Sequence, residues 1–155
     1  MRSQIVLTIL CLLSLSFCIE EEEFPIENDI TVLTEATFDK AISKYEHILV
    51  MFYAPWCGHC KQLLPKYEEA AKKLKAKNPK IVLAKMDATE NEVESVHITG
   101  FPTIKFYPGN KKSSKPMDYN GERTTEGIIK FLQTNAYNKV VLDEEEKKEE
   151  KTADL

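Results

Sequence analysis

The sequence predicts an α/β protein with a mixed central sheet and helices on both faces. Strand and helix signals alternate through the body of the chain, residues 24–142. The segment 48–54 is apolar on both faces, as a central strand covered on each side must be. Other segments repeat apolar residues at helical spacing, so each buries one face. These patterns favour two layers of helices with a sheet between them.

The first half of the body contains two strands and two helices. Residues 30–33 are a strand candidate, and Thr34 can cap the helix that follows. The apolar stripe of that helix is formed by Phe38, Ala41, Ile42 and Tyr45. The central strand, 48–54, leads into a second helix over 57–77. The apolar stripe of this second helix is formed by Leu64, Tyr67, Ala71 and Leu74.

The second half completes a βαβαβαββα order. A strand over 81–86 precedes a short helix over 90–96, and another strand covers 103–107. Residues 108–110 supply turn chemistry. The next strand, 116–119, begins with proline and is therefore expected at an edge of the sheet. Thr124 or Thr125 caps the last helix, whose inward residues are Ile128, Ile129, Leu132 and Ala136.

Composition limits the classes of function. The chain has 155 residues, 43% hydrophobic and 30% charged, which suits one globular domain. Its 21 basic and 25 acidic residues give a net charge of −4. A broadly basic protein built to neutralise phosphates is excluded, so we expect no nucleic-acid partner. Four cysteines are too few for a small disulfide-stapled scaffold.

Residues 1–18 have the three-part pattern of a secretory signal peptide. Arg2 gives a basic start, residues 5–15 are almost all apolar, and small residues follow at Ser16 and Cys18. The alternatives are a membrane anchor or a buried helix. A membrane span needs roughly 20 apolar residues, so this stretch is too short. We therefore expect cleavage after Cys18 and no membrane association afterwards.

Charged segments flank the expected domain. Residues 19–23 are an acidic leader, and residues 143–155 are a charged C-terminal tail. The last four residues, Thr-Ala-Asp-Leu, loosely resemble the Lys-Asp-Glu-Leu retrieval signal. Together with the signal peptide, this favours the endoplasmic reticulum lumen, with secretion as the alternative.

Signal cleavage leaves Cys57 and Cys60 as the two cysteines of the mature chain. A pair three positions apart cannot connect distant parts of the fold. A disulfide between them would close a short, strained ring, and strained disulfides are labile. In an exported protein this pattern indicates redox chemistry in preference to structural support.

The residue types around the pair suit that chemistry. The stretch 56–61 reads Trp-Cys-Gly-His-Cys-Lys and lies where strand 48–54 gives way to a helix. At a helix N-terminus, free N–H groups and the helix dipole favour an anion, so the pKa of Cys57 should be lowered. His59 adds a donor or a positive charge near the same sulfur. Cys60, one turn on, can release whatever Cys57 captures, and Gly58 permits close approach of a substrate.

Other uses of a Cys-x-x-Cys pair fit less well. Structural zinc needs four ligands, and none of His47, His59 and His97 is spaced as a second ligand pair. Haem attachment would need histidine at position 61, where the chain has lysine. A purely structural disulfide remains an alternative. We therefore expect neither a metal nor a cofactor.

At this point three stretches resemble one family. Residues 53–61, Tyr-Ala-Pro-Trp-Cys-Gly-His-Cys-Lys, resemble the catalytic stretch of the protein disulfide isomerase branch of the thioredoxin superfamily. Residues 100–103, Gly-Phe-Pro-Thr, resemble its second signature, and Tyr119-x-Gly-x-Arg123 resembles its third. The three occur in the family's order, and the likeness covers residues 24–137. The resemblance implies a thioredoxin fold.

The resemblance also implies roles for residues outside the cysteine pair. A cis bond before Pro102 would let the backbone of Phe101, after Gly100, pair with a substrate strand beside Cys57. Trp56 would be an apolar contact surface; the alternative is a core tryptophan. Arg123 would approach Cys60 and lower its pKa; the alternative is a solvated charge before a helix.

One position departs from the family pattern. The family usually has a buried glutamate two residues before Tyr53, paired with a lysine of the next strand and taken to shuttle protons for the resolving cysteine. Here that position is Met51, while the lysine is present as Lys85. We expect slower proton transfer at Cys60 and little change in the attack by Cys57. Lys85 must reach solvent, lower its pKa or find another partner.

Two functions follow from these expectations. The first is a thiol–disulfide oxidoreductase that forms, reduces or rearranges disulfides in unfolded or misoxidised client proteins of the secretory pathway. Glutathione or a thiol oxidase would be its electron partner. The second is a redox-dependent escort module that captures clients with little turnover. Turnover on a scrambled client distinguishes the two. The sequence leaves open the direction of the reaction, the clients and the oligomeric state.

Overall fold

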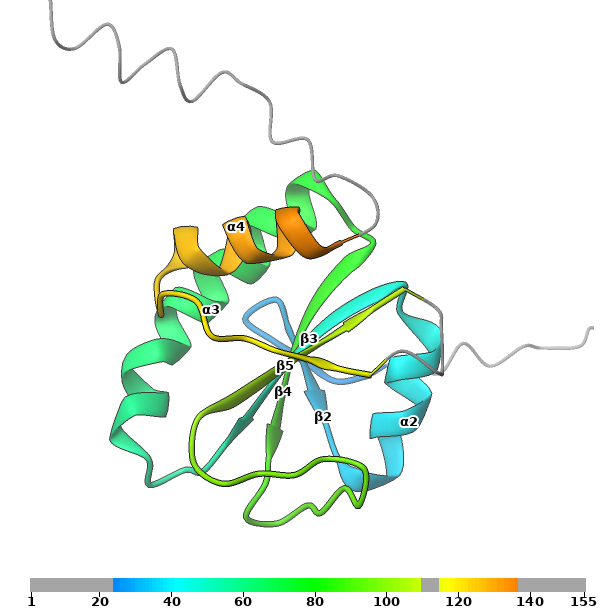
Figure 1. Cartoon of the computed structure of the whole chain (residues 1–155), viewed down its shortest axis with the longest axis vertical. Coiled ribbons are helices and arrows are strands. Elements are labelled where there is room, and N and C mark those ends of the chain that lie inside the picture. Colours follow the sequence, from blue (N-terminus) through cyan, green and yellow to red (C-terminus); the bar gives the residue numbers. More distant parts are fainter. Residues whose placement is uncertain (1–23, 110–114, 137–155) are drawn as a thin grey trace, which may run out of the picture.

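Six strands form one mixed sheet in the order β1-β2-β4-β3-β5-β6 (Figure 1). This computed structural model describes residues 24–109 and 115–136. The strands are β1 (Ile26–Glu27), β2 (Ile30–Leu33), β3 (His47–Tyr53), β4 (Ile81–Asp87), β5 (Thr103–Pro108) and β6 (Met117–Asp118). The helices are α2 (Glu35–Lys44), α3 (Gly58–Lys77) and α4 (Thr125–Asn135). The predicted signal peptide (1–18), leader (19–23) and tail (143–155), together with residues 137–142, lie outside the described residues.

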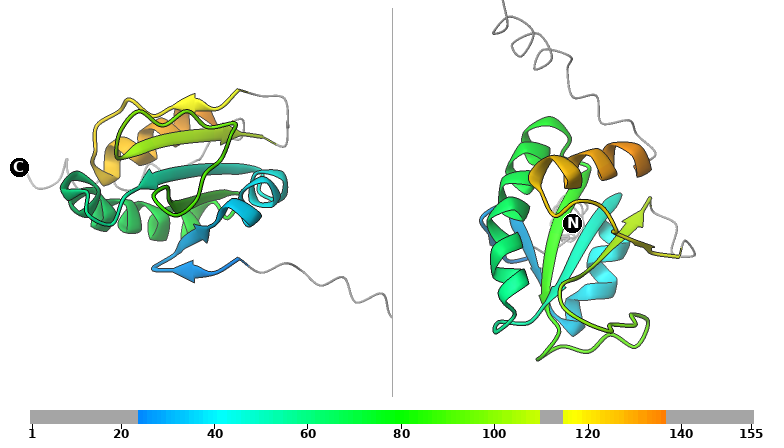
Figure 2. Two further views of the ribbon diagram at one scale, coloured as in Figure 1. Left: turned by 90° about the horizontal axis from the view of Figure 1, so that it is seen from below. Right: turned by 60° about the vertical axis from the view of Figure 1, so that its left-hand side comes forward.

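The predicted α/β architecture is confirmed. β4 pairs in parallel with β2 and β3, while the pairs β1–β2, β3–β5 and β5–β6 are antiparallel. α2 covers one face of the sheet, and α3 with α4 covers the other (Figures 1 and 2). β6 is an edge strand, as its leading proline predicts. Within the described part of the chain, no helix is long and apolar enough to cross a bilayer.

β3 is the central strand, and its side chains divide between two cores. Leu49 and Met51 belong to the core beneath α3 and α4, whereas Ile48, Val50 and Phe52 belong to the core beneath α2. All five are almost completely buried. Successive side chains of a strand point to opposite faces of the sheet, and helices cover both faces here. This explains why the segment is apolar throughout. The strand delivers the chain directly to the cysteine motif.

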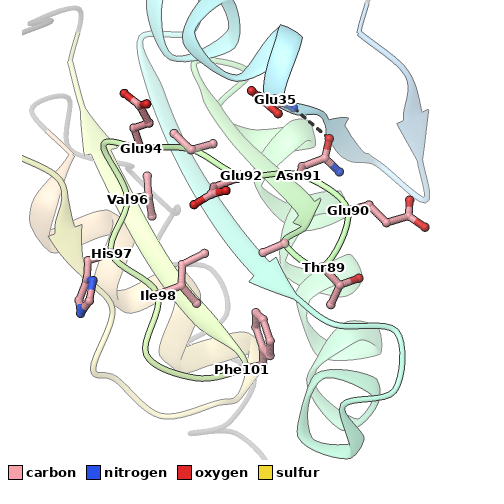
Figure 3. A pocket seen from close by; sticks show the side chains of 12 residues that line it. Glu35, Thr89, Glu90, Asn91, Glu92, Glu94, Val96, His97, Ile98 and Phe101 are labelled. Carbon is pink, nitrogen blue, oxygen red and sulfur yellow. Dashed lines mark hydrogen bonds between the residues drawn. The ribbon is translucent and has the colours of Figure 1, made fainter.

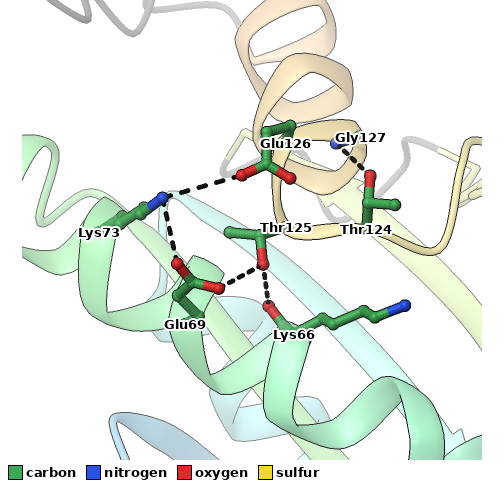
Figure 4. A network of polar contacts seen from close by, with 7 residues as sticks. All are labelled: Lys66, Glu69, Lys73, Thr124, Thr125, Glu126 and Gly127. Carbon is green, nitrogen blue, oxygen red and sulfur yellow. Dashed lines mark hydrogen bonds and ion pairs between the residues drawn. The ribbon is translucent and has the colours of Figure 1, made fainter. Parts of the chain in front are cut away.

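Helix α3 is held to the sheet by buried polar contacts and to α4 by partly buried ones. The Tyr67 hydroxyl, fully buried, lies 2.7 Å from the Leu49 carbonyl oxygen and 3.1 Å from that of Ala84, so it reaches both β3 and β4. Thr125, at the start of α4, donates to Glu69 at 2.8 Å and approaches the Lys66 carbonyl at 3.2 Å (Figure 4). The hydrogen bond from Thr125 is the main cause of the lowered pKa of Glu69. These contacts fix the helix that begins at the cysteines.

The predicted helix over 90–96 is wrong. Its residues form turns and irregular backbone. Asp87 accepts from the backbone and hydroxyl of Thr89, at 2.9 and 2.6 Å, and the Asn91 side chain donates to the Asp87 carbonyl. Asn91 also accepts from the Glu35 backbone at 3.0 Å (Figure 3). Such local side-chain bonds compete with helix formation. The segment instead lines a hollow of about 710 Å³ that reaches Phe101.

The first predicted strand, β2, is the second strand of a hairpin whose first strand, β1, was not predicted. β1 pairs with β2 around Asn28 and Asp29, which both have positive φ, 50° and 64°. A two-residue turn of this kind suits a tight hairpin, and Asn and Asp tolerate it. Asn28 donates to Glu68 at 2.9 Å, and Lys75 donates to Asp29 at 2.7 Å. The hairpin is thereby held against α3.

His47 begins β3 and is buried. Its Nδ1 accepts from the Gly109 backbone at 3.0 Å, while Nε2 has no hydrogen-bond partner. Burial lowers the pKa of His47, partly offset by Glu46. The neutral ring therefore belongs to the folded state. This position makes His47 a structural residue.

His47 should make the fold less stable in mild acid. The unfolded chain takes up a proton at His47 near its ordinary pKa of 6.5, whereas the folded chain does so only at lower pH. The free energy of unfolding should therefore fall as pH drops below about 6.5 and level off below the folded-state pKa. Denaturant unfolding of the wild type and of His47→Asn between pH 8 and 5 measures this. Equal pH slopes for the two proteins would contradict the assignment.

Candidate active site

The cysteine motif lies at the junction of β3 and α3. β3 ends at Tyr53, and the backbone N–H of Cys57 donates to the Ala54 carbonyl at 3.0 Å to close the turn. Cys57 is the N-cap of α3, as the sequence predicts. Its sulfur therefore lies at the positive end of the 20-residue helix.

Cys57 and Cys60 form a disulfide, with Cα atoms 5.3 Å apart. The Cys57 sulfur also accepts from the Cys60 backbone N–H at 3.2 Å. When the disulfide is reduced, the same N–H and the helix dipole favour a thiolate at Cys57. The first turn of α3 thus provides the electrostatic basis for a reactive first cysteine.

Position in the helix distinguishes the two sulfurs better than exposure does. Cys57 is 7% exposed and Cys60 3%, so both are buried in the disulfide form. Only Cys57 occupies the cap, whereas Cys60 is inside the first turn. Both pack with Ala54, Tyr53 and Phe101 in a small apolar cluster. Attack at Cys57 and resolution by Cys60 stay predictions.

The second signature lies beside the disulfide. The Phe101–Pro102 bond is cis, as the resemblance implies. Gly100 precedes it, and its carbonyl accepts from the Thr103 hydroxyl at 2.7 Å. Phe101 contacts the cysteine cluster, and its ring stands edge-on to Trp56 with centroids 5.8 Å apart. The loop before β5 is thereby placed next to the helix start.

Trp56 is a surface residue. Its side chain is 71% exposed, which excludes the alternative of a core tryptophan. A Cβ added at Gly58 would meet no atom within 4 Å, so the space in front of that residue is open. An apolar ring and accessible backbone therefore border the disulfide on its solvent side.

Arg123 is exposed and lines one small hollow together with residues from the first turns of α3. A hollow of about 70 Å³ is lined by His59, Gln62, Leu63, Lys66 and Arg123. Cys60 does not line this hollow. The approach of Arg123 to Cys60 that the resemblance implies stays a prediction.

A second cavity lies behind Cys60 and has a volume of about 240 Å³. It is lined by Met51, Tyr53, Ala54, Pro55, Cys60, Lys61, Leu64 and Lys85. Met51 and Lys85 are register partners on β3 and β4, so their side chains share the face toward α3. Of the three outcomes expected for Lys85, the structure shows another partner: its Nζ lies 2.7 Å from Oε2 of Glu27.

Sequence reasoning missed Glu27 because β1 was not predicted. The signal was present: Asn28-Asp29 between two short β-prone segments is a hairpin pattern.

Within residues 24–109 and 115–136, no three side chains among His, Cys, Asp and Glu are grouped to hold a metal ion.

Comparison with known proteins agrees with this geometry. The family model described as Thioredoxin matches residues 29–134, which is most of the chain. The chain belongs to the thioredoxin family. The thioredoxin fold expected from the sequence is thereby confirmed for this thioredoxin-family protein.

Similar proteins come from the disulfide isomerase branch. The thioredoxin-family chain is 48% identical over 110 residues to a protein disulfide-isomerase of Drosophila melanogaster, covering 70% of this chain and 22% of that protein. It is 45% identical over 133 residues to protein disulfide-isomerase A3 of Gallus gallus, covering 83% and 26%. The chain thus spans about a quarter of these relatives.

One solved structure and this chain match over most of the length of both. The first thioredoxin domain of mouse protein disulfide-isomerase A4 is 38% identical, with a TM-score of 0.63. The match covers 74% of this chain and 81% of that domain. The likeness is therefore to one thioredoxin domain of a larger protein.

Proposed function

We propose that the protein is a thiol–disulfide oxidoreductase that forms, reduces or rearranges disulfides in client proteins of the secretory pathway. The observation that carries the proposal is the Cys57–Cys60 disulfide at the N-terminus of α3, beside the loop that precedes Pro102. Relatives named protein disulfide-isomerase support it.

In the reducing direction, the Cys57 thiolate attacks one sulfur of a client disulfide. A mixed disulfide forms, and the other client sulfur leaves as a thiolate. Cys60 then loses its proton and attacks the Cys57 sulfur, which releases the second client sulfur and leaves the Cys57–Cys60 disulfide. The reverse sequence oxidises a client dithiol. Electrons leave or enter through glutathione or a thiol oxidase.

The neighbouring residues have distinct parts in this proposal. An extended client would lie next to the disulfide, in a place bordered by Trp56, Gly58, Gly100, Phe101 and Pro102. His59, as a donor or a cation near Cys57, favours the reduced thiolate, which makes the disulfide more oxidising. Arg123 adds a positive charge to the same side of the helix.

The site of action that we propose is the endoplasmic reticulum lumen, with secretion as the alternative. The support is the signal-like pattern of residues 1–18, the charged tail and the names of the relatives. Unfolded or misoxidised proteins are the corresponding clients.

The second candidate, an escort with little turnover, is favoured by one observation. The chain matches about a quarter of the length of larger relatives, so most of each relative has no counterpart in the match. Rescue of a scrambled, disulfide-containing client in glutathione buffer separates the two candidates. The oxidoreductase should restore client activity at a molar ratio well below one. Stoichiometric mixed disulfides without rescue would support the escort.

A further inference from the structure

The cavity behind Cys60 contains a nearly buried ammonium group. Two lysines line this cavity: Lys61 is exposed, whereas the Lys85 side chain is only 11% exposed. The remaining lining is mostly apolar, and no carboxylate is among it. A charge in such surroundings acts more strongly on its neighbours than a charge in water does.

The carboxylate that pairs with Lys85 comes from outside the cavity. Glu27, on the edge strand β1, is 62% exposed and accepts from Lys85 at 2.7 Å. The hairpin that carries Glu27 lies at one edge of the sheet (Figure 2). Its turn is held to α3 through Asn28 and Asp29. The pair therefore has a solvated acidic end and a buried basic end.

Other charged and titratable groups face the same space. Tyr53 contributes from β3 and Lys61 from α3. Asp87, at the end of β4, does not line the cavity but acts on Tyr53 through its charge. Burial raises the pKa of Tyr53, and Lys85 opposes that rise while Asp87 and Glu27 add to it. Lys85 and Tyr53 thus line one cavity, and the Lys85 charge acts on the Tyr53 hydroxyl. Cys60 lines that same cavity.

We propose that Lys85 is a positioning residue for the release step: its ammonium stabilises the Cys60 thiolate across the cavity, and Glu27 limits this effect by partly neutralising the ammonium. The inference rests on the proposed function. It gives Lys85 a part in the reaction although Met51 occupies the position facing it on β3.

The step involves no additional reactant beyond water. In the mixed disulfide, the Cys60 thiol gives its proton to solvent, and the resulting thiolate is stabilised by Lys85. It attacks the Cys57 sulfur, the Cys57–client bond breaks, and the Cys57–Cys60 bond forms. The client sulfur leaves with the electron pair and takes a proton from solvent.

Two substitutions test the proposal because they break the same ion pair but change the charge at the cavity in opposite directions. Lys85→Met removes the ammonium, whereas Glu27→Gln leaves it unpaired. If Lys85 acts through its charge, the two substitutions should change the rate of release by Cys60 in opposite directions. If its role is merely structural, they should change that rate in the same direction.

A matched control is available in Lys105 and Asp118. Their ion pair is 2.6 Å long, with side chains 13% and 61% exposed, nearly the same as Lys85 and Glu27. Lys105 is on β5 and does not line the Cys60 cavity. Lys105→Met therefore removes an equally buried ammonium elsewhere in the sheet.

The measurement is a stopped-flow single turnover of the reduced protein with a fluorescent glutathione disulfide. The release rate is the plateau that no longer rises with substrate concentration, recorded from pH 5 to 9. Lys85→Met should lower this rate about tenfold at pH 7 and move the profile to higher pH. Glu27→Gln should raise the rate and move the profile to lower pH. Lys105→Met should match the wild type.

Changes in the same direction for Lys85→Met and Glu27→Gln, or profiles equal to that of Lys105→Met, would overturn the proposal. If Lys85→Met does not fold, Glu27→Gln decides alone, because its side chain is exposed: a profile that does not move to lower pH overturns the proposal. A wild type without any disulfide exchange would contradict the proposed function, and this inference with it. Wild-type exchange with unmoved variants contradicts this inference alone.

Discussion

Cys57→Ser should abolish disulfide exchange, whereas Cys60→Ser should keep the first step and accumulate the mixed disulfide. Cys57 is the helix cap that accepts from the Cys60 backbone, so it is the sulfur prepared for attack. Cys60 lies inside the first turn and is placed to resolve the intermediate. Turnover should be lost in Cys57→Ser, and in Cys60→Ser it should fall to the rate at which an outside thiol such as glutathione releases the mixed disulfide.

The two variants differ in what they trap. After incubation with a disulfide-containing client and an acid quench, non-reducing gels with mass spectrometry should find a client adduct at Cys57 in Cys60→Ser. Cys57→Ser should give none, and it serves as the matched control. Adducts that form mainly at Cys60 in Cys57→Ser would reverse the assignment of the two roles.

Tyr67→Ala should be the most destabilising single change considered for the fold. Tyr67 is fully buried between α3 and the sheet, and its hydroxyl contacts the carbonyls of Leu49 and Ala84. Replacing a large buried aromatic side chain by alanine costs about 3–5 kcal/mol in free energy of unfolding. The loss falls on the helix that holds both cysteines.

Tyr67→Phe separates the hydroxyl from the ring. It keeps the packing and removes the donor, so it should cost about 1–3 kcal/mol. Urea unfolding of the oxidised wild type and both variants gives the two free energies directly. A Tyr67→Phe protein as stable as the wild type would show that the two carbonyl contacts contribute nothing, and equal losses in the two variants would assign the whole effect to the hydroxyl.

The parts of the fold that the sequence predicts best are those where local pattern and tertiary environment agree. β3 has an apolar residue at nearly every position because both of its faces are covered, so periodicity and burial give the same answer. Cys57 at the helix start follows from the change from strand to helix pattern. Phe38 and Ala41 of α2 are buried as their spacing predicts.

The segment 90–96 was mispredicted because side chains compete with the backbone there. Asp87, Thr89 and Asn91 bond to one another's backbone and to Glu35, a residue far away in the sequence. Helical spacing of apolar residues cannot reveal such contacts. Val96 also packs into the core on the α2 side of the sheet, which holds the segment in this irregular course.

Glu27 could not be assigned to Lys85 from the sequence, since 58 positions separate them. The absence of a carboxylate at position 51 showed only that Lys85 needed another partner or solvent. The hairpin turn at Asn28 and Asp29 decides which acid reaches it. This contact changes the expectation for Cys60: a charged group lines its cavity although Met51 is apolar.

The central claim is that the start of α3 holds the Cys57 sulfur ionised near neutral pH. The direct measurement is the rate of Cys57 alkylation by iodoacetamide against pH in reduced Cys60→Ser protein, followed at Cys57 by mass spectrometry. In the folded protein, the midpoint should lie clearly below the value of about 8.5 for free cysteine, and it should return to that value in urea. Equal midpoints in the folded and unfolded protein would contradict the account.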